Sequence, residues 1–81
     1  MISRQVLRLL HSNEQLETPQ DLRTNHLVDA VEGASEEQIG RELERLIDAG
    51  YVTAVEFKSF GTPYGYGALR LTERGMLEAT V

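Results

Sequence analysis

The segment from Ser35 to Tyr51, SEEQIGRELERLIDAGY, constrains the fold more than any other part of the chain. Ser35 can accept the amide hydrogen of Gln38 while the Gln38 side chain reaches back to Ser35, a reciprocal arrangement that starts helices. Gly50 can end the helix in a left-handed conformation, with Tyr51 packing back on Leu46. The apolar residues between these signals share one helical face: Ile39, Leu43, Leu46 and Ile47. The sequence therefore predicts a capped helix over residues 35–49.

An earlier helix is predicted near the start of the chain. Its apolar residues also recur on one helical face: Ile2, Val6, Leu9 and Leu10. We expect this helix to run from about residue 2 to His11 or Ser12, with Leu7 on a neighbouring face.

A second helix is predicted from residues 18–21, TPQD. A threonine can accept the third following amide, and proline suits the first helical position, so this stretch is typical of a helix start. We favour a helix from there to Val31. Alternatively, residues 23–25, RTN, break it into a turn and a second start capped by Asn25. Residues 15–17 could supply a one- or two-residue strand before it.

The second and third helices are separated by a turn of about four residues, EGAS, in which Gly33 can adopt the left-handed conformation. Two helices joined by such a turn make a helix-turn-helix.

Beyond the third helix the pattern changes to alternation. Residues 51–58 alternate between two faces, and residues 68–72 form a return strand with Leu69 and Leu71 on one face. The connection SFGTPYGYG is longer than a tight turn. Thr72 can cap a last short helix, from Glu73 to about Ala79, that buries one of two apolar residues, Met76 or Leu77.

This order of elements resembles the winged helix-turn-helix superfamily over nearly the whole chain. Ile39 to Val52, I-x-x-x-L-x-x-L-I-x-x-G-Y-V, and Leu69 to Gly75, LRLTERG, are similar to the recognition helix and closing turn of MarR- and PadR-type repressors. The size resembles small winged-helix proteins of phages and prophages. The resemblance implies an α+β fold with a three-helix core, a two- or three-stranded antiparallel wing and a short C-terminal helix, all in one domain, 1–81.

Composition limits the function. The net charge is −5, and the predicted third helix alone carries −3, whereas nucleic-acid binders usually show a basic stripe. Cysteine is absent, which excludes disulfides and thiolate metal sites and suits a cytoplasmic protein. We expect neither a membrane span nor a signal peptide, because the apolar runs are too short.

The candidate DNA-binding residues of the third helix are Gln38, Arg41 and Arg45. On its outward face the two arginines lie one turn apart and could reach guanine edges, with Gln38 contacting adenine. In the alternative interpretation Arg41 pairs with Glu37, and Arg45 pairs with Asp48 or Glu42. Both interpretations stay open.

The wing adds Lys58, Tyr64 and Tyr66 as candidate DNA-binding residues. Aromatic rings between glycines can stack on bases or enter a minor groove, with Lys58 on a phosphate. Alternatively, Phe57 and one tyrosine cover a small core, or the tyrosines form a protein interface.

Other chemistry has little support in the sequence. His11 and His26 lack neighbours at metal-ligand spacing, so surface or helix-end roles are expected and no metal site. No nucleophile motif or phosphate-binding loop is present, so we expect no enzyme activity and no cofactor. An apolar patch of Leu7, Met76 and Leu77 could form a homodimer, or the tail could simply cover Leu7.

These observations lead to two hypotheses. The first is a small winged-helix protein that binds double-stranded DNA, as a transcriptional regulator or phage-type accessory factor. The second is a winged-helix module that binds a protein partner through its acidic third helix and aromatic wing.

Overall fold

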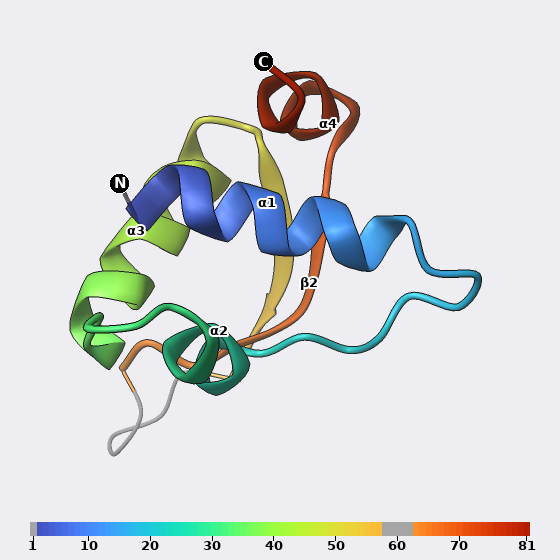
Figure 1. Ribbon diagram of the computed structural model, residues 1–81. Helices are drawn as coiled ribbons and strands as arrows, with labels where there is room; N and C mark the ends of the chain where they lie inside the picture. Colours follow the sequence, from blue (N-terminus) through green and yellow to red (C-terminus); the bar gives the residue numbers. More distant parts are fainter. Residues whose placement is uncertain (1, 58–62) are drawn as a thin grey trace.

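A computed structural model describes residues 2–57 and 63–81. The described part has an α+β fold with four helices and one two-stranded antiparallel sheet. The elements follow the order α1 (Ile2–Glu14), α2 (Thr24–Ala30), α3 (Glu36–Asp48), β1 (Val52–Glu56), β2 (Tyr66–Leu71) and α4 (Glu73–Ala79). The three N-terminal helices pack together, α1 crosses the sheet and α4 packs on α1 (Figure 1).

Helix α3 forms as its capping residues predict. The Ser35 hydroxyl accepts the Gln38 amide at 3.1 Å, and the Gln38 side-chain oxygen accepts the Ser35 amide at 2.8 Å. At the other end Gly50 has φ +83°, and the Tyr51 amide donates to the Leu46 carbonyl at 2.9 Å. This closure is the Schellman arrangement. Gly33 has φ +80°, as its predicted turn requires.

Helix α2 starts later than the favoured prediction. Residues 18–21 are not helical; α2 begins after Arg23, whose amide donates to His26 Nδ1 at 3.0 Å. The predicted start at TPQD is therefore wrong, and the alternative of a break before a second start is closer. The physical reason lies in α1: the buried Asn13 side chain donates to the Gln20 carbonyl at 3.0 Å and accepts the Gln20 amide at 2.9 Å. These bonds hold the chain in a non-helical conformation before α2.

Helices α1 and α4 differ little from their predictions. Helix α1 continues to Glu14, two or three residues further than predicted. Helix α4 has the predicted bounds, and the Thr72 hydroxyl accepts the Gly75 amide at 3.0 Å as an N-cap. Met76 is half-buried, whereas Leu77 is 68% exposed, so Met76 is the residue that α4 covers.

The sheet contains β1 and β2 in antiparallel register, with Val52 opposite Leu71, Thr53 opposite Arg70 and Val55 opposite Gly67. One extra residue in β2 forms a bulge at Ala68, which has φ +48°. Strand β2 starts at residue 66, two residues before the predicted return strand. Residues 15–17 form no strand.

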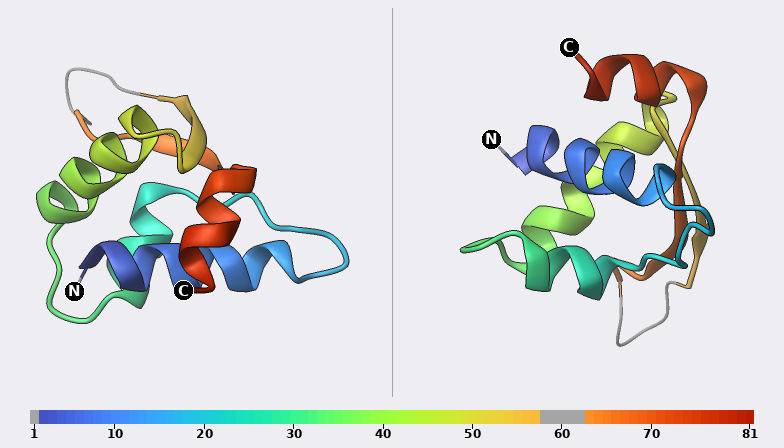
Figure 2. Two further views of the ribbon diagram at one scale, coloured as in Figure 1. Left: turned by 90° about the horizontal axis from the view of Figure 1, so that it is seen from above. Right: turned by 45° about the vertical axis from the view of Figure 1, so that its right-hand side comes forward.

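The core lies between the helices and the inner face of the sheet. Its buried members are Val6, Leu7, Leu10, Leu27, Val31, Ile39, Leu43, Leu46, Val52, Tyr66 and Leu69. In the left view of Figure 2, β1 lies on the side of β2 away from α1 and α2. Among the described residues, no helix is long and apolar enough to cross a membrane.

Candidate interaction surface

On the exposed face of α3, the two predicted arginines each pair with a glutamate of the same helix. Arg41 donates to Glu37 Oε1 from Nε at 3.0 Å and from Nη2 at 2.7 Å. Arg45 pairs with Glu42 one turn earlier. The hydrogen bond from each guanidinium to its carboxylate raises the pKa of both arginines above the usual value. The intrahelical pairs that the sequence suggested are therefore present, with Glu42 rather than Asp48 as the partner of Arg45.

These pairs leave α3 with an excess of negative charge. Five acidic residues lie on the helix: Glu36, Glu37, Glu42, Glu44 and Asp48. Two arginines oppose them, so the sum is −5 + 2 = −3. The side chains of Arg41 and Arg45 remain 69% and 61% exposed. Gln38 is exposed as well, but its side-chain oxygen is engaged in the cap.

Tyr64 lies against α3 rather than on an outward wing. A Cβ atom at Gly40 would fall inside van der Waals contact with the Cβ, Cγ and Cδ1 of Tyr64, so the tyrosine packs directly on the glycine. Its side chain is half-buried. The absence of a side chain at Gly40 thus lets the base of the hairpin approach α3 closely.

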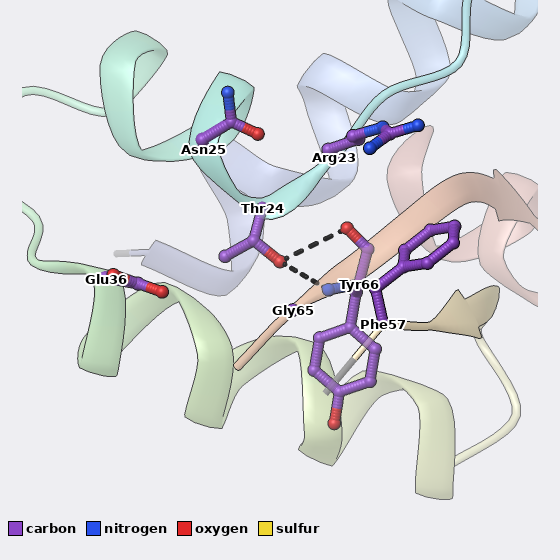
Figure 3. Close-up of a pocket in the computed structure, with 7 residues that line it drawn as sticks. All are labelled: Arg23, Thr24, Asn25, Glu36, Phe57, Gly65 and Tyr66. Atoms are coloured by element: carbon purple, nitrogen blue, oxygen red, sulfur yellow. Dashed lines mark hydrogen bonds between the residues drawn. The ribbon is translucent and has the colours of Figure 1, made fainter. Parts of the chain in front are cut away.

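Tyr66 belongs to the core. It is 2% exposed, and its ring extends toward α3 (Figure 3). The burial of Tyr66 argues against its predicted contact with DNA, because a side chain in the core does not reach a groove. In the alternative, Phe57 and one tyrosine cover the core; Tyr66 is buried as that alternative requires, whereas Phe57 is 48% exposed. Lys58, the remaining candidate, lies outside the described residues.

Thr24 joins α2 to the hairpin. Its hydroxyl donates to the Tyr64 carbonyl at 2.7 Å and accepts the Tyr66 amide at 3.0 Å. Figure 3 shows Thr24 facing Tyr66 across the junction. The threonine is 4% exposed, so these bonds are shielded from water. Local sequence patterns do not identify Thr24, since its partners are 40 and 42 positions away.

A hollow of about 300 Å³ opens beside this junction. It is lined by Arg23, Thr24, Asn25, Glu36, Phe57, Gly65 and Tyr66 (Figure 3). Glu36 and Asn25 lie at one side, and Arg23 and Phe57 at the other. Phe57 is 48% exposed, and the Arg23 guanidinium lies 5.0 Å from the centre of its ring. The hollow therefore combines a carboxylate from the first turn of α3 with a half-exposed aromatic ring.

Glu14 and Arg70 join α1 to the sheet on another side of the molecule. Arg70 donates to both Glu14 oxygens, at 2.6 and 2.8 Å, and the Leu71 amide donates at 3.3 Å. The hydrogen bond from Arg70 lowers the pKa of Glu14, and burial opposes it in part. Arg70 is thereby engaged in an ion pair with α1, which leaves the β-hairpin with less unpaired positive charge than its sequence suggests.

The predicted dimer patch and the two histidines do not contribute to the surface of α3 or to the hollow. Leu7 is 4% exposed within the chain, so the predicted dimer patch of Leu7, Met76 and Leu77 lacks one member at the surface. His26 lies at the start of α2, a helix-end position of the kind the sequence predicts. Among the described residues, no group of three or more histidine, cysteine or acidic side chains could hold a metal ion.

Comparison with known proteins adds no identification: no family model, curated protein or solved structure matches this chain.

Proposed function

We propose that this chain is a winged helix-turn-helix domain that acts as a protein-interaction module. The exposed face of α3 and the adjoining hollow bind a positively charged segment of a partner protein. The order of α2, α3 and the β-hairpin supports the fold assignment, but fold alone does not decide function, which depends on the residues of the site.

The observation that carries the proposal is the pairing of both α3 arginines with carboxylates of the same helix. Affinity for nucleic acid comes largely from cations that displace counterions from phosphate. Arg41 and Arg45 are engaged with Glu37 and Glu42, and the helix retains a net charge of −3. Such a surface repels phosphate and attracts lysine and arginine side chains.

The hollow supplies the apolar part of the contact. Glu36 can pair with an incoming ammonium or guanidinium group. The exposed part of Phe57, whose ring packs on Gly67 and lies beside Arg23, offers apolar surface to an aliphatic stem. A basic segment with apolar neighbours therefore fits this surface. A cytoplasmic partner suits a chain without cysteine.

Binding to double-stranded DNA is the second candidate, and one observation favours it. The side chains of Arg41 and Arg45 are largely exposed and lie about one turn apart on one face. Exposed pairs at these spacings stabilise a helix only weakly, so phosphate or guanine could replace the carboxylates.

The test compares two labelled probes by fluorescence anisotropy. The first is random-sequence duplex DNA; the second is a set of peptides selected on this protein from a displayed random library. We expect the selected peptides to be rich in lysine or arginine. Their binding should weaken as salt rises from about 50 to about 200 mM. The double variant E36Q/F57A should lose at least about tenfold in peptide affinity. The control Glu73→Gln removes an exposed carboxylate of α4 and should change nothing.

The proposal would be overturned in favour of DNA binding by two results together. The first is salt-sensitive binding of the duplex that disappears in the variant R41A/R45A. The second is that the selected peptides carry no cation or bind E36Q/F57A as tightly as the wild type.

A further inference from the structure

The two edges of the sheet differ in how their backbone groups are bonded. The outer edge of β2 is covered by the segment before α2 and by the first residue of α2. The Leu69 amide donates to the Leu22 carbonyl at 3.1 Å, and the Ala68 amide donates to Asp21 Oδ1 at 2.7 Å. The Thr24 hydroxyl accepts the Tyr66 amide. This edge is therefore closed by its own chain.

The outer edge of β1 is open at its centre. In an antiparallel pair, alternate residues direct both backbone groups toward the partner strand. The Phe57 amide donates to the Gly65 carbonyl at 2.7 Å, and the Tyr51 carbonyl accepts the Thr72 amide at 3.1 Å. Thr53 and Val55 alternate with Tyr51 and Phe57 along the strand and therefore also direct their backbone groups toward β2. The amide and carbonyl groups of Val52 and Ala54 therefore point away from β2, and no other segment of the described residues bonds them.

Several features that commonly protect an edge strand are absent from β1, although the strand is short and carries one charge, at Glu56. Such strands usually carry a bulge, a proline or a lysine that prevents pairing. Residues 52–56, VTAVE, contain none of these, and the bulge of this sheet lies in β2. Val55 is 50% exposed beside the open edge, on the outward face that it shares with Thr53.

We infer that β1 pairs with β1 of a second copy of this chain, antiparallel about a twofold axis at Ala54. The two hairpins then form one four-stranded sheet. The edge parity requires that Val52, Ala54 and Glu56 be the hydrogen-bonded residues, and an axis at Ala54 pairs the whole length of β1. In this register Ala54 exchanges two backbone hydrogen bonds with Ala54 of the second copy, and Thr53 lies opposite Val55.

Charge and shape within the strand make it complementary to itself. The one charged residue of β1, Glu56, lies opposite Val52 of the second copy, so the two carboxylates do not face each other. Thr53 and Val55 form two symmetric pairs of β-branched side chains, which favour sheet pairing.

The total charge of the chain opposes this association and gives it a diagnostic salt dependence. Each copy carries −5, so salt that screens the repulsion should strengthen the dimer. Binding of a basic partner should weaken with salt. The opposite salt dependences therefore distinguish a failure of the dimer from a failure of the proposed binding to a basic partner.

The experiment is sedimentation equilibrium of the full chain, from about 10 μM to about 1 mM, at about 50 and 500 mM salt. We expect a monomer–dimer equilibrium that shifts toward dimer at the higher salt. The variant T53K/V55K places lysine opposite lysine in the dimer and should raise the dissociation constant at least about tenfold. Its net charge is −5 + 2 = −3, so general repulsion between copies cannot account for the loss.

The matched control changes the same two exposed positions. The variant T53E/V55K places glutamate opposite lysine at both symmetric pairs, keeps the net charge at −5 and should retain the dimer. Ala54→Pro, which removes an amide that no bond within the hairpin uses, should also raise the dissociation constant about tenfold or more. A monomeric mass throughout the range, or equal dimerisation of the two double variants, would overturn the inference.

Discussion

Substitution of Gly40 by alanine tests the contact between α3 and the hairpin. Alanine normally stabilises a helix interior by about 0.5–1 kcal/mol relative to glycine, because it restricts the unfolded chain. At this position the new methyl group would overlap the Cβ, Cγ and Cδ1 of Tyr64. Carbon atoms rest about 3.5–4.0 Å apart, so the tyrosine must move by about 1 Å or more.

Overpacking of this kind costs about 1–3 kcal/mol, which exceeds the gain in helix propensity. We therefore expect Gly40→Ala to lower the free energy of unfolding by about 1 kcal/mol, or the melting temperature by about 4–8 °C. When Tyr64 is replaced by glycine, the obstacle is gone, and the same substitution should stabilise the chain by up to about 1 kcal/mol.

The assay is urea denaturation followed by circular dichroism, for the wild type, the two single variants and the double variant. The coupling energy of this cycle should be about 1–3 kcal/mol. A result in which Gly40→Ala stabilises the chain equally with and without Tyr64 would refute the reasoning. The hairpin would then not be docked on α3, and the hollow between Glu36 and Phe57 would not be preformed.

Three further predictions concern the stability of the fold. The pKa of Glu14 is lowered in the folded chain, so its ion pair stabilises the fold above the unfolded pKa of about 4.3 and is lost as pH falls below it. Glu14→Gln should flatten acid denaturation monitored by circular dichroism, and an unchanged acid midpoint and slope would contradict the role of Arg70. Ser35→Ala removes the cap of α3 and should cost about 1 kcal/mol in urea denaturation; a loss below about 0.3 kcal/mol would mean that the cap is dispensable. Leu43→Ala should cost about 2–5 kcal/mol because the side chain is fully buried. Leu77→Ala, at an exposed site, should stay within about 0.5 kcal/mol. Equal effects of these last two changes would show that the core is elsewhere.

Local signals decided which parts of the fold could be predicted from sequence. The bounds of α3 follow from Ser35, Gln38 and Gly50, whose partners lie within five positions, and the cap of α4 follows from Thr72 in the same way. The start of α2 could not be predicted, because the bonds that keep residues 18–21 out of a helix come from Asn13 and from β2.

The candidate site was predicted only in part for the same reason. The arginine pairs of α3 are local and were foreseen as one of two alternatives. Tyr66 resembles its neighbour Tyr64 in sequence, since both lie beside glycines in one loop. Only the register of β2, with its bulge, turns the Tyr66 side chain into the core. Thr24 carries no motif at all, and its role depends on a hairpin that is 40 residues away.

Because β2 is hydrogen-bonded on both edges, the sheet and the segment before α2 can be completed only after β2 has been synthesised. Strand β2 has β1 on one side and the segment before α2 on the other, so it occupies a central position although it is one of the last elements made. Until residue 71 has been synthesised, Leu69 and Tyr66 are missing from the core, and the amides of the late strand cannot yet hold the early segment in place. Helices as short as α1, α2 and α3 are marginally stable alone, so they gain their full packing only when β2 is present between β1 and the segment before α2.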